Sequence, residues 1–181
     1  KGRVLCWGTG TSGQLGDSDN LLPLGGFTSG GEFNSNFADY PMGTTYLGST
    51  RGSVAVSTNQ GVPNSYSGMV IPGPISQWGG TGTHTVSFEW SVYSEGCYDK
   101  ANFGKITSQG FNSVRSQCNN NGAWTSVSYP YDPSTMNIGW WYYKDGSANS
   151  GTDTMYVDDI VVRDGSGTIV YEQDFDSISG T

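Results

Sequence analysis

The chain has 181 residues, and its 16 Asp and Glu against 8 Lys and Arg give a net charge of −8. This excess of negative charge repels phosphate backbones, so nucleic acid is not an expected partner. The sequence has neither a run of the roughly 18 apolar residues that a membrane span needs nor a basic amphipathic segment, so membrane insertion is not expected either.

The composition favours β-structure. Charged residues make up only 13% of the chain, there are 28 glycines, and Ser, Thr and Asn fill the spaces between short hydrophobic runs. Such residues form turns, and no segment sustains a period of 3.6. The length fits one large domain with a single core.

Residues 1–31 are Gly-rich and are predicted to be an extension or linker. The pieces RVLCWG from Arg3 and SGQLG from Ser12 resemble one repeat of a regulator-of-chromosome-condensation β-propeller. A propeller needs several blades, so either further repeats lie outside this chain or the match is accidental. The first residue is Lys1 rather than Met, which predicts a processed chain or a fragment of a longer one.

From Glu32 to Thr181 short strands alternate with turn signals. Strands are predicted at 46–47, 54–56, 67–71, 83–93, 113–115, 124–129, 137–143, 154–162 and 168–173. In the clearest of these, one face carries Val86, Phe88, Trp90 and Val92 and the other carries Ser87, Glu89 and Ser91. The pattern predicts an all-β domain over residues 32–181, folded as a two-sheet antiparallel β-sandwich.

Six motifs occur in a characteristic order. They are VSFEWSVYSE from Val86, YD from Tyr98, GAWTSVS from Gly122, IGWWYYKDGS from Ile138, SGTD from Ser150 and YVDDI from Tyr156. This order resembles accessory jelly-roll (concanavalin/MAM-like) domains of bacteria and phages, which are similar to MAM adhesion modules and carbohydrate-binding modules. The resemblance implies a non-catalytic module of a large secreted, cell-surface or virion protein.

A candidate ligand surface lies on the strand that begins near Ile138. The resemblance places Ile138, Trp140 and Tyr142 inward, which leaves Trp141 and Tyr143 as an exposed aromatic pair, and Trp124 is a further candidate. Sugars stack their C–H faces on such rings. The alternative is that Trp141 and Tyr143 pack beneath a long loop.

Acidic residues suggest a metal site. They are Asp145, Asp153, Asp158 and Asp159, with Glu32 and Asp39 near the start of the sandwich. The resemblance implies a structural Ca²⁺ that ties the first strand to the last, held by Glu32, Asp39, Asp158 and Asp159. Strict alternation would direct either Asp158 or Asp159 to the interior, where it needs a partner. Alternatively, these acids cap turns or pair with Lys144 and Arg163.

The three cysteines are unevenly spaced. Cys97 and Cys118 flank a hairpin-sized interval and are predicted to form a disulfide, whereas Cys6 lies far away. Three buried thiols are the alternative. Relative to the family pattern, the interval between Cys97 and Cys118 is long and polar, so it could carry a feature particular to this protein.

Catalysis is not expected. His84 is the only histidine, and the sequence has no nucleophile elbow, zinc-binding His pair or phosphate loop. A glycosidase or polysaccharide lyase could use Glu89 and Glu95, but Glu89 alternates outward and Glu95 belongs to the resemblance motif.

These observations predict an extracellular, non-catalytic binding or adhesion module that recognises glycan, such as a cell-surface polysaccharide, within a larger protein or assembly. The alternatives are a structural or receptor-binding domain of a virus particle, and a small polysaccharide lyase or glycosidase.

Overall fold

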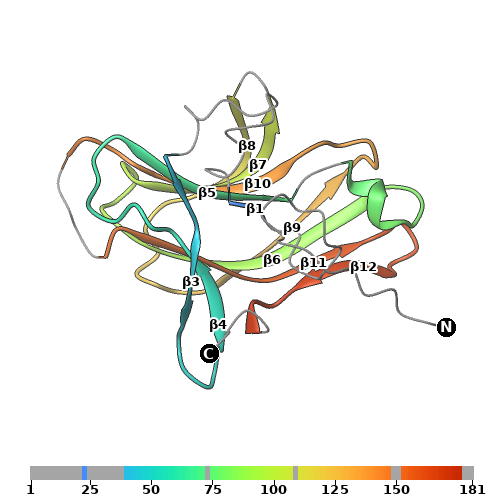
Figure 1. Ribbon diagram of the computed structural model, residues 1–181, viewed down its shortest axis with the longest axis horizontal. Coiled ribbons are helices and arrows are strands. Elements are labelled where there is room, and N and C mark those ends of the chain that lie inside the picture. Colours follow the sequence, from blue (N-terminus) through green and yellow to red (C-terminus); the bar gives the residue numbers. More distant parts are fainter. Residues whose placement is uncertain (1–21, 24–38, 72–73, 108–109, 148–151, 177–181) are drawn as a thin grey trace, which may run out of the picture.

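Two predominantly antiparallel β-sheets stack face to face in the computed structural model (Figure 1). The structure describes residues 22–23, 39–71, 74–107, 110–147 and 152–176. Within these ranges the helical structure consists of one 3₁₀ turn, η3 (Ile75–Trp78). None of the described helical structure has the length and apolarity that a membrane crossing requires. The prediction of an all-β, two-sheet sandwich is confirmed.

The first sheet, sheet A, has six strands. They are β1 (Leu22–Pro23), β2 (Tyr40–Pro41), β5 (Ser65–Ile71), β7 (Lys100–Thr107), β8 (Gly110–Gln117) and β10 (Ile138–Lys144). The strand order is β1-β5-β10-β7-β8, and β2 pairs with β5 in parallel. The central strand β10 therefore has a neighbour on each side and exposes no backbone edge.

The second sheet, sheet B, also has six strands. They are β3 (Gly43–Tyr46), β4 (Ser53–Val56), β6 (His84–Tyr93), β9 (Thr125–Tyr131), β11 (Thr154–Arg163) and β12 (Ile169–Gln173). The order is β3-β4-β11-β6-β9, and β12 pairs with the second half of β11. The outer strand β9 lies beside β6, the strand with the clearest alternation in the sequence.

The core lies between the sheets and is rich in aromatic rings. Phe88 of β6 contacts Phe103 of β7 and Trp140 of β10, with ring centroids 4.6 and 5.3 Å apart. The residues predicted to face inward on β6 and β10 are all at most 2% exposed; they are Val86, Phe88, Trp90, Val92, Ile138, Trp140 and Tyr142. Burial of these large side chains is the main apolar contribution to stability.

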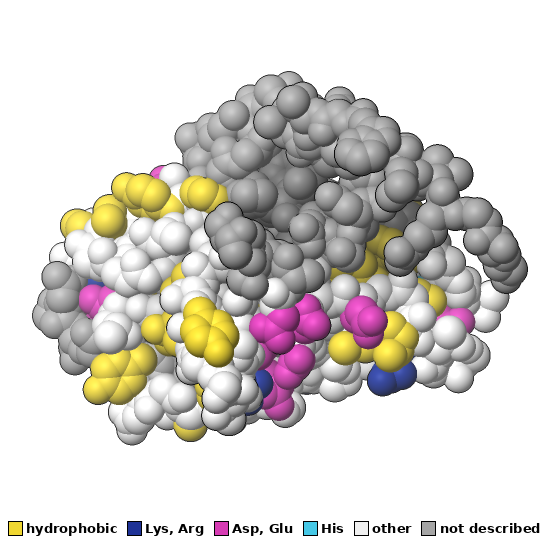
Figure 2. Space-filling view, turned by 60° about the horizontal axis from the view of Figure 1, so that its bottom comes forward, with side chains coloured by type: hydrophobic (Ala, Val, Ile, Leu, Met, Phe, Trp, Pro, Cys, Tyr) yellow, Lys and Arg dark blue, Asp and Glu magenta, His cyan; other side chains and the backbone are white. Residues whose placement is uncertain are grey.

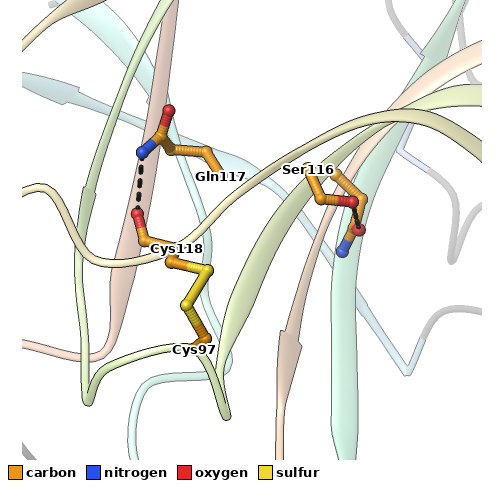
Figure 3. The surroundings of a disulfide bond; sticks show 5 residues. Cys97, Ser116, Gln117 and Cys118 are labelled. Carbon is orange, nitrogen blue, oxygen red and sulfur yellow. Dashed lines mark hydrogen bonds between the residues drawn. A yellow bond between two sulfur atoms is a disulfide. The ribbon is translucent and has the colours of Figure 1, made fainter.

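The interval between the paired cysteines is the hairpin of β7 and β8, which extends well beyond the predicted strand at 113–115. Strand β7 has no clear alternation that would predict it, because Gly104 and Lys105 interrupt its apolar positions. The predicted Cys97–Cys118 disulfide is confirmed, with an S–S distance of 2.09 Å (Figure 3). It joins the chain just before β7 to the chain just after β8, so it closes the base of the hairpin.

Strand β11 departs from strict alternation. Asp158 lies opposite Glu89 and Val161 lies opposite Ser87, so β11 contains one extra residue at this point. Asp159 adopts a φ of 51° in this bulge. Asp158 is 3% exposed, so one of the two acids is buried as predicted, and Arg51 is its partner. It lies opposite Glu89 on the outer face, however, and the extra residue turns Ile160 into the core instead.

Most of the predicted extension lies outside the described residues, including Cys6 and the propeller-like pieces that begin at Arg3 and Ser12. The two described residues of β1 pair with β5 of the sandwich. The division at residues 31 and 32 stays a prediction.

Candidate functional site

Aromatic side chains gather on the outer face of sheet A. Alternation along β10 directs Trp141 and Tyr143 outward, and Tyr143 lies directly opposite Tyr66 of β5. The rings of Tyr66 and Tyr143 are 4.9 Å apart, and both side chains are half-buried. Burial raises the pKa of the Tyr66 hydroxyl, and the neighbouring Tyr143 and Asp39 raise it further. We refer to Tyr66 and Tyr143 as the tyrosine pair.

The β7–β8 hairpin folds back over this face. Phe111 of β8 and Tyr66 of β5 are separated by two strands and by most of the length of β10, so a flat sheet would place them more than about 20 Å apart. Their ring centroids are only 5.5 Å apart. Figure 1 shows the hairpin rising out of sheet A. The outer face of sheet A is therefore concave.

Two glycines permit the fold-back. At Gly104, where the pairing of β7 with β8 shifts register, an added Cβ would lie 2.0 Å from the carbonyl oxygen of Asn112. At Gly139 of β10, an added Cβ would lie 2.2 Å from Cδ1 of Ile106. A larger residue at either position would clash, so the close approach of the hairpin depends on both glycines.

The fold-back buries Trp141. Its side chain is 3% exposed and packs in a second apolar cluster, which we call the outer cluster, with Val70, Ile106, Tyr66 and Phe111. The Phe111 ring stacks on Trp141 at 4.5 Å and 16°. The prediction that Trp141 is exposed beside Tyr143 is therefore wrong. Trp141 is buried, as the alternative expects, but beneath Phe111 of strand β8 rather than beneath a long loop. Tyr143 and Tyr66 stay partly accessible on this face. Tyr66 was not among the predicted ligand residues, because the predicted strand begins one residue later, at Ser67.

Polar groups border the outer cluster. Asn102 of β7 lies opposite Trp141, and its side-chain oxygen accepts hydrogen bonds from the exposed hydroxyls of Ser116 at 2.8 Å and Ser113 at 3.4 Å. Its amide nitrogen donates to the carbonyl oxygen of Lys100 at 3.1 Å. Asn102 thus holds two exposed hydroxyls in place on the aromatic face.

The outer face of sheet B is charged instead. The guanidinium of Arg51 lies 4.1 Å above the ring of Trp124 and forms an ion pair with Glu89. It also lies 3.4 Å from Asp158 and 3.6 Å from Asp159. In Figure 2, which turns the sheet B side toward the viewer, acidic side chains form a row with a basic group beside it. Trp124, a predicted ligand residue, is half-buried beneath Arg51.

The predicted Ca²⁺ ligands are not brought together. Asp39 is on the sheet A side, where its carboxylate accepts the backbone N–H of Tyr66 at 2.8 Å. Asp158 and Asp159 are on sheet B and face Arg51 rather than the alternatives Lys144 and Arg163. Glu32 lies outside the described residues. The predicted metal set is therefore corrected: strand pairing places its members on different sheets, next to other partners.

Burial raises the pKa of Asp158 to about 6, and the negative charge of Asp159 adds to this effect. The backbone N–H of Asp159 and the Arg51 guanidinium oppose the shift, because both stabilise the carboxylate. Asp158 is thus a buried acid on the outer face of sheet B that is easily protonated.

A different acidic group does come together. Among the described residues, Glu95, Asp99 and Asp145 place carboxylate oxygens within 4.8 Å of one another. We refer to these three residues as the acidic cluster. Lys144 lies beside it, 3.3 Å from Asp99 and 3.6 Å from Asp145.

The candidate catalytic residues have structural partners. His84 is fully buried, and its ring nitrogens lie 3.0 Å from the carbonyl oxygens of Gly82 and Gly79. Glu89 is paired with Arg51 and accepts a hydrogen bond from Ser126, and Glu95 accepts one from Ser147. These contacts tie the residues to turns and neighbouring strands.

Comparison with known proteins gives similar solved structures, whereas no family model matches and no curated protein matches in sequence. The fold is similar to the CBM22-1 xylan-binding domain of Paenibacillus barcinonensis Xyn10C, at 11% identity and a TM-score of 0.41 over 72% of this chain and 81% of that one. It is also similar to the C-terminal family 22 carbohydrate-binding module of Clostridium thermocellum Xyn10B, at 11% identity and a TM-score of 0.45, over 85% of this chain and 92% of that one. A further similar structure is the family 11 carbohydrate-binding module of the C. thermocellum cellulase Lic26A-Cel5E, at 16% identity and a TM-score of 0.38, over 66% of this chain and 79% of that one. These structural neighbours are carbohydrate-binding modules with β-sandwich folds, and the resemblance to MAM domains stays a prediction.

Proposed function

We propose that this chain is a non-catalytic glycan-binding module whose ligand lies across the concave outer face of sheet A. The observation that carries the proposal is the tyrosine pair, two partly accessible rings 4.9 Å apart on adjacent strands. Tyr66 also belongs to the outer cluster, and its contact with Phe111 fixes the position of the pair.

This arrangement matches the chemistry of a sugar. A pyranose presents C–H groups that pack on aromatic rings, and hydroxyls that require hydrogen-bond partners. The tyrosine pair supplies ring area and phenolic groups, and Ser113 and Ser116 supply further hydroxyls on the same face. Because the rings lie on packed strands rather than on free loops, little conformational entropy is lost on binding.

The charges near the tyrosine pair favour a neutral glycan. Lys100 lies opposite Tyr143 on one side, and Asp39 contacts the backbone of Tyr66 on the other. One positive and one negative group give no net attraction for a polyuronate. The Cys97–Cys118 disulfide supports a secreted or cell-surface setting, because such bonds persist in oxidising compartments.

The test is affinity electrophoresis against soluble neutral polysaccharides, with titration calorimetry on any that retard the protein. Tyr143→Ala should weaken binding about tenfold or more, as expected for the loss of an aromatic contact worth about 1–2 kcal/mol. Tyr156→Ala is the matched control, because Tyr156 is a half-buried tyrosine on the outer face of sheet B. An equal loss of affinity in both variants would place the ligand elsewhere, and no retardation by any polysaccharide would contradict the function.

A further inference from the structure

A lysine and an aspartate meet inside the sandwich at one end of sheet A. Lys144 is the last residue of β10, and Asp99 immediately precedes β7. In the register of these two strands Tyr143 lies opposite Lys100, so Lys144 and Asp99 form the next pair along. Alternation directs both side chains to the inner face, the face that carries the buried Tyr142. The two residues are therefore cross-strand neighbours on the core side of the sheet.

This pair is shielded from water. Both side chains are 0% exposed, and Nζ of Lys144 lies 3.3 Å from Oδ2 of Asp99. Oδ1 of Asp145 lies 3.6 Å from the same Nζ, and the charge of the buried Asp153 also acts on Lys144. Removing two charges from water is costly, and their mutual attraction repays this cost only in part. As an ion pair, Lys144 and Asp99 would therefore add little to stability.

The resting form of Lys144 is the ammonium. Burial acts to lower its pKa, but the hydrogen bond to Asp99 and the charges of Asp99, Asp153 and Asp145 raise it overall. A neutral amine therefore does not form by loss of a proton to solvent. It forms when Nζ passes a proton to the facing carboxylate, which leaves two neutral groups and the same number of bound protons. Burial favours this exchange, because it penalises the charged forms.

We propose that Lys144 and Asp99 join in an isopeptide bond, an amide between Nζ and Cγ that cross-links the end of β10 to the start of β7. Oδ1 of Asp99 accepts the backbone N–H of Asp145 at 2.7 Å, and this contact stabilises the negative charge that the oxygen gains when Nζ attacks Cγ. Oδ2 faces Nζ and is the oxygen that leaves. The paired strands hold the two groups side by side, so the attack is intramolecular.

The reaction is a dehydration that needs no further reagent. The Cγ–Nζ bond forms, the Cγ–Oδ2 bond breaks, and the electron pair of the broken bond stays on the oxygen. Of the ammonium protons, one remains on the amide nitrogen and the others leave with the oxygen as water. Asp145 accepts one of these protons from Nζ and returns it to the departing oxygen, since its Oδ1 lies 3.6 Å from Nζ. The product is neutral, so the cost of burying two charges disappears.

The experiment is mass spectrometry of the intact full chain, unfolded with its disulfide in place. The bond should lower the mass by about 18 Da, one water, relative to the mass calculated for the disulfide-bonded chain. After reduction and tryptic digestion, the segments around Asp99 and Lys144 should appear as one branched peptide, with no cleavage after Lys144. Fragmentation of that peptide locates the link. A wild-type mass equal to the calculated one would overturn the proposal.

Two lysine variants complete the test. Lys144→Arg keeps a cation beside Asp99 but lacks the amine, so its mass should equal the calculated one. Lys100→Arg is the matched control, because Lys100 is exposed on the opposite face of the same strand pair, and it should keep the loss of water. A succinimide at an Asp–Gly step also loses water, but Lys144→Arg would retain that loss, and this result would overturn the isopeptide bond. The wild-type mass and branched peptide decide the question even if Lys144→Arg does not fold.

Discussion

The outer faces of the two sheets differ in what covers them. On sheet A the β7–β8 hairpin folds back and builds a second apolar cluster around Trp141. On sheet B a single arginine covers Trp124 and is held there by three acids. Each sheet thus carries an outward tryptophan, but the one on sheet A is covered by aromatic rings and the other by a guanidinium.

The two outer faces therefore differ in how much they contribute to stability and in whether they carry the proposed ligand surface. The outer cluster gives sheet A a second apolar face, opposite the one in the core, and the tyrosine pair lies at the border of this cluster. On sheet B the ion pairs compete with solvent and contribute less. The predictions below compare the two faces, in order of decreasing effect.

Replacing the two outward tryptophans tests the comparison most directly. Trp141→Ala should lower the free energy of unfolding by about 3–5 kcal/mol, as expected for a large buried ring. Trp124→Ala should cost about 1 kcal/mol, because the ring is half-buried and its main partner is one cation. Urea denaturation measures both. Similar losses would show that the two faces are equally important for stability.

Removing the disulfide tests how the hairpin is held. The bond spans a sequence separation of 21, and its loss should cost about 3 kcal/mol through the added entropy of the unfolded chain. The double variant Cys97→Ser, Cys118→Ser, melted beside the wild type, provides the measurement. A much smaller loss would show that the cross-link restricts the unfolded chain little, or that its removal relieves strain in the folded hairpin.

The buried acid of sheet B predicts a pH dependence. Because the pKa of Asp158 is raised to about 6, the folded state favours its protonated form. The resulting stabilisation is present below about pH 4 and is lost as the pH rises through about 6, a change of up to about 3 kcal/mol. Asp158→Asn should therefore have a flatter stability profile than the wild type between pH 4 and 6.

Asp132→Asn gives the opposite control for this profile. Hydrogen bonds from Ser134 hold the pKa of Asp132 below its usual value, so its contribution is lost as the pH falls. Urea midpoints at several pH values separate the two variants. Identical slopes for the wild type and Asp158→Asn would contradict the role of Asp158.

The smallest effect on stability concerns the exposed hydroxyls. Ser116→Ala should change the free energy of unfolding by less than about 0.5 kcal/mol but weaken glycan binding by about 1 kcal/mol. Ser128→Ala is its counterpart on sheet B, where the serine is exposed and bonded to Ser87. Calorimetric titration should find no loss for Ser128→Ala, and a loss in that variant would place the ligand on sheet B.

Local pattern determined much of the fold. The alternation from Val86 to Val92 predicts a half-buried strand, and all four of its apolar residues lie in the core. The spacing of Cys97 and Cys118 predicts their bond, because a hairpin brings its ends together. Both features depend on residues close in sequence, so periodicity and spacing suffice to find them.

The site was determined by contacts between distant segments. Whether Trp141 faces solvent depends on a hairpin that bends at Gly104 and places Phe111 on the indole ring. Whether acids share a site depends on which sheet each strand joins. Strand pairing separates Asp39 from Asp158 and brings Asp145 to Asp99. Sequence by itself determined the strands with clear alternation and their inward faces, such as those of β6 and β10. Only the tertiary structure decided what covers the outward faces, because that depends on bends and strand order that no local period encodes.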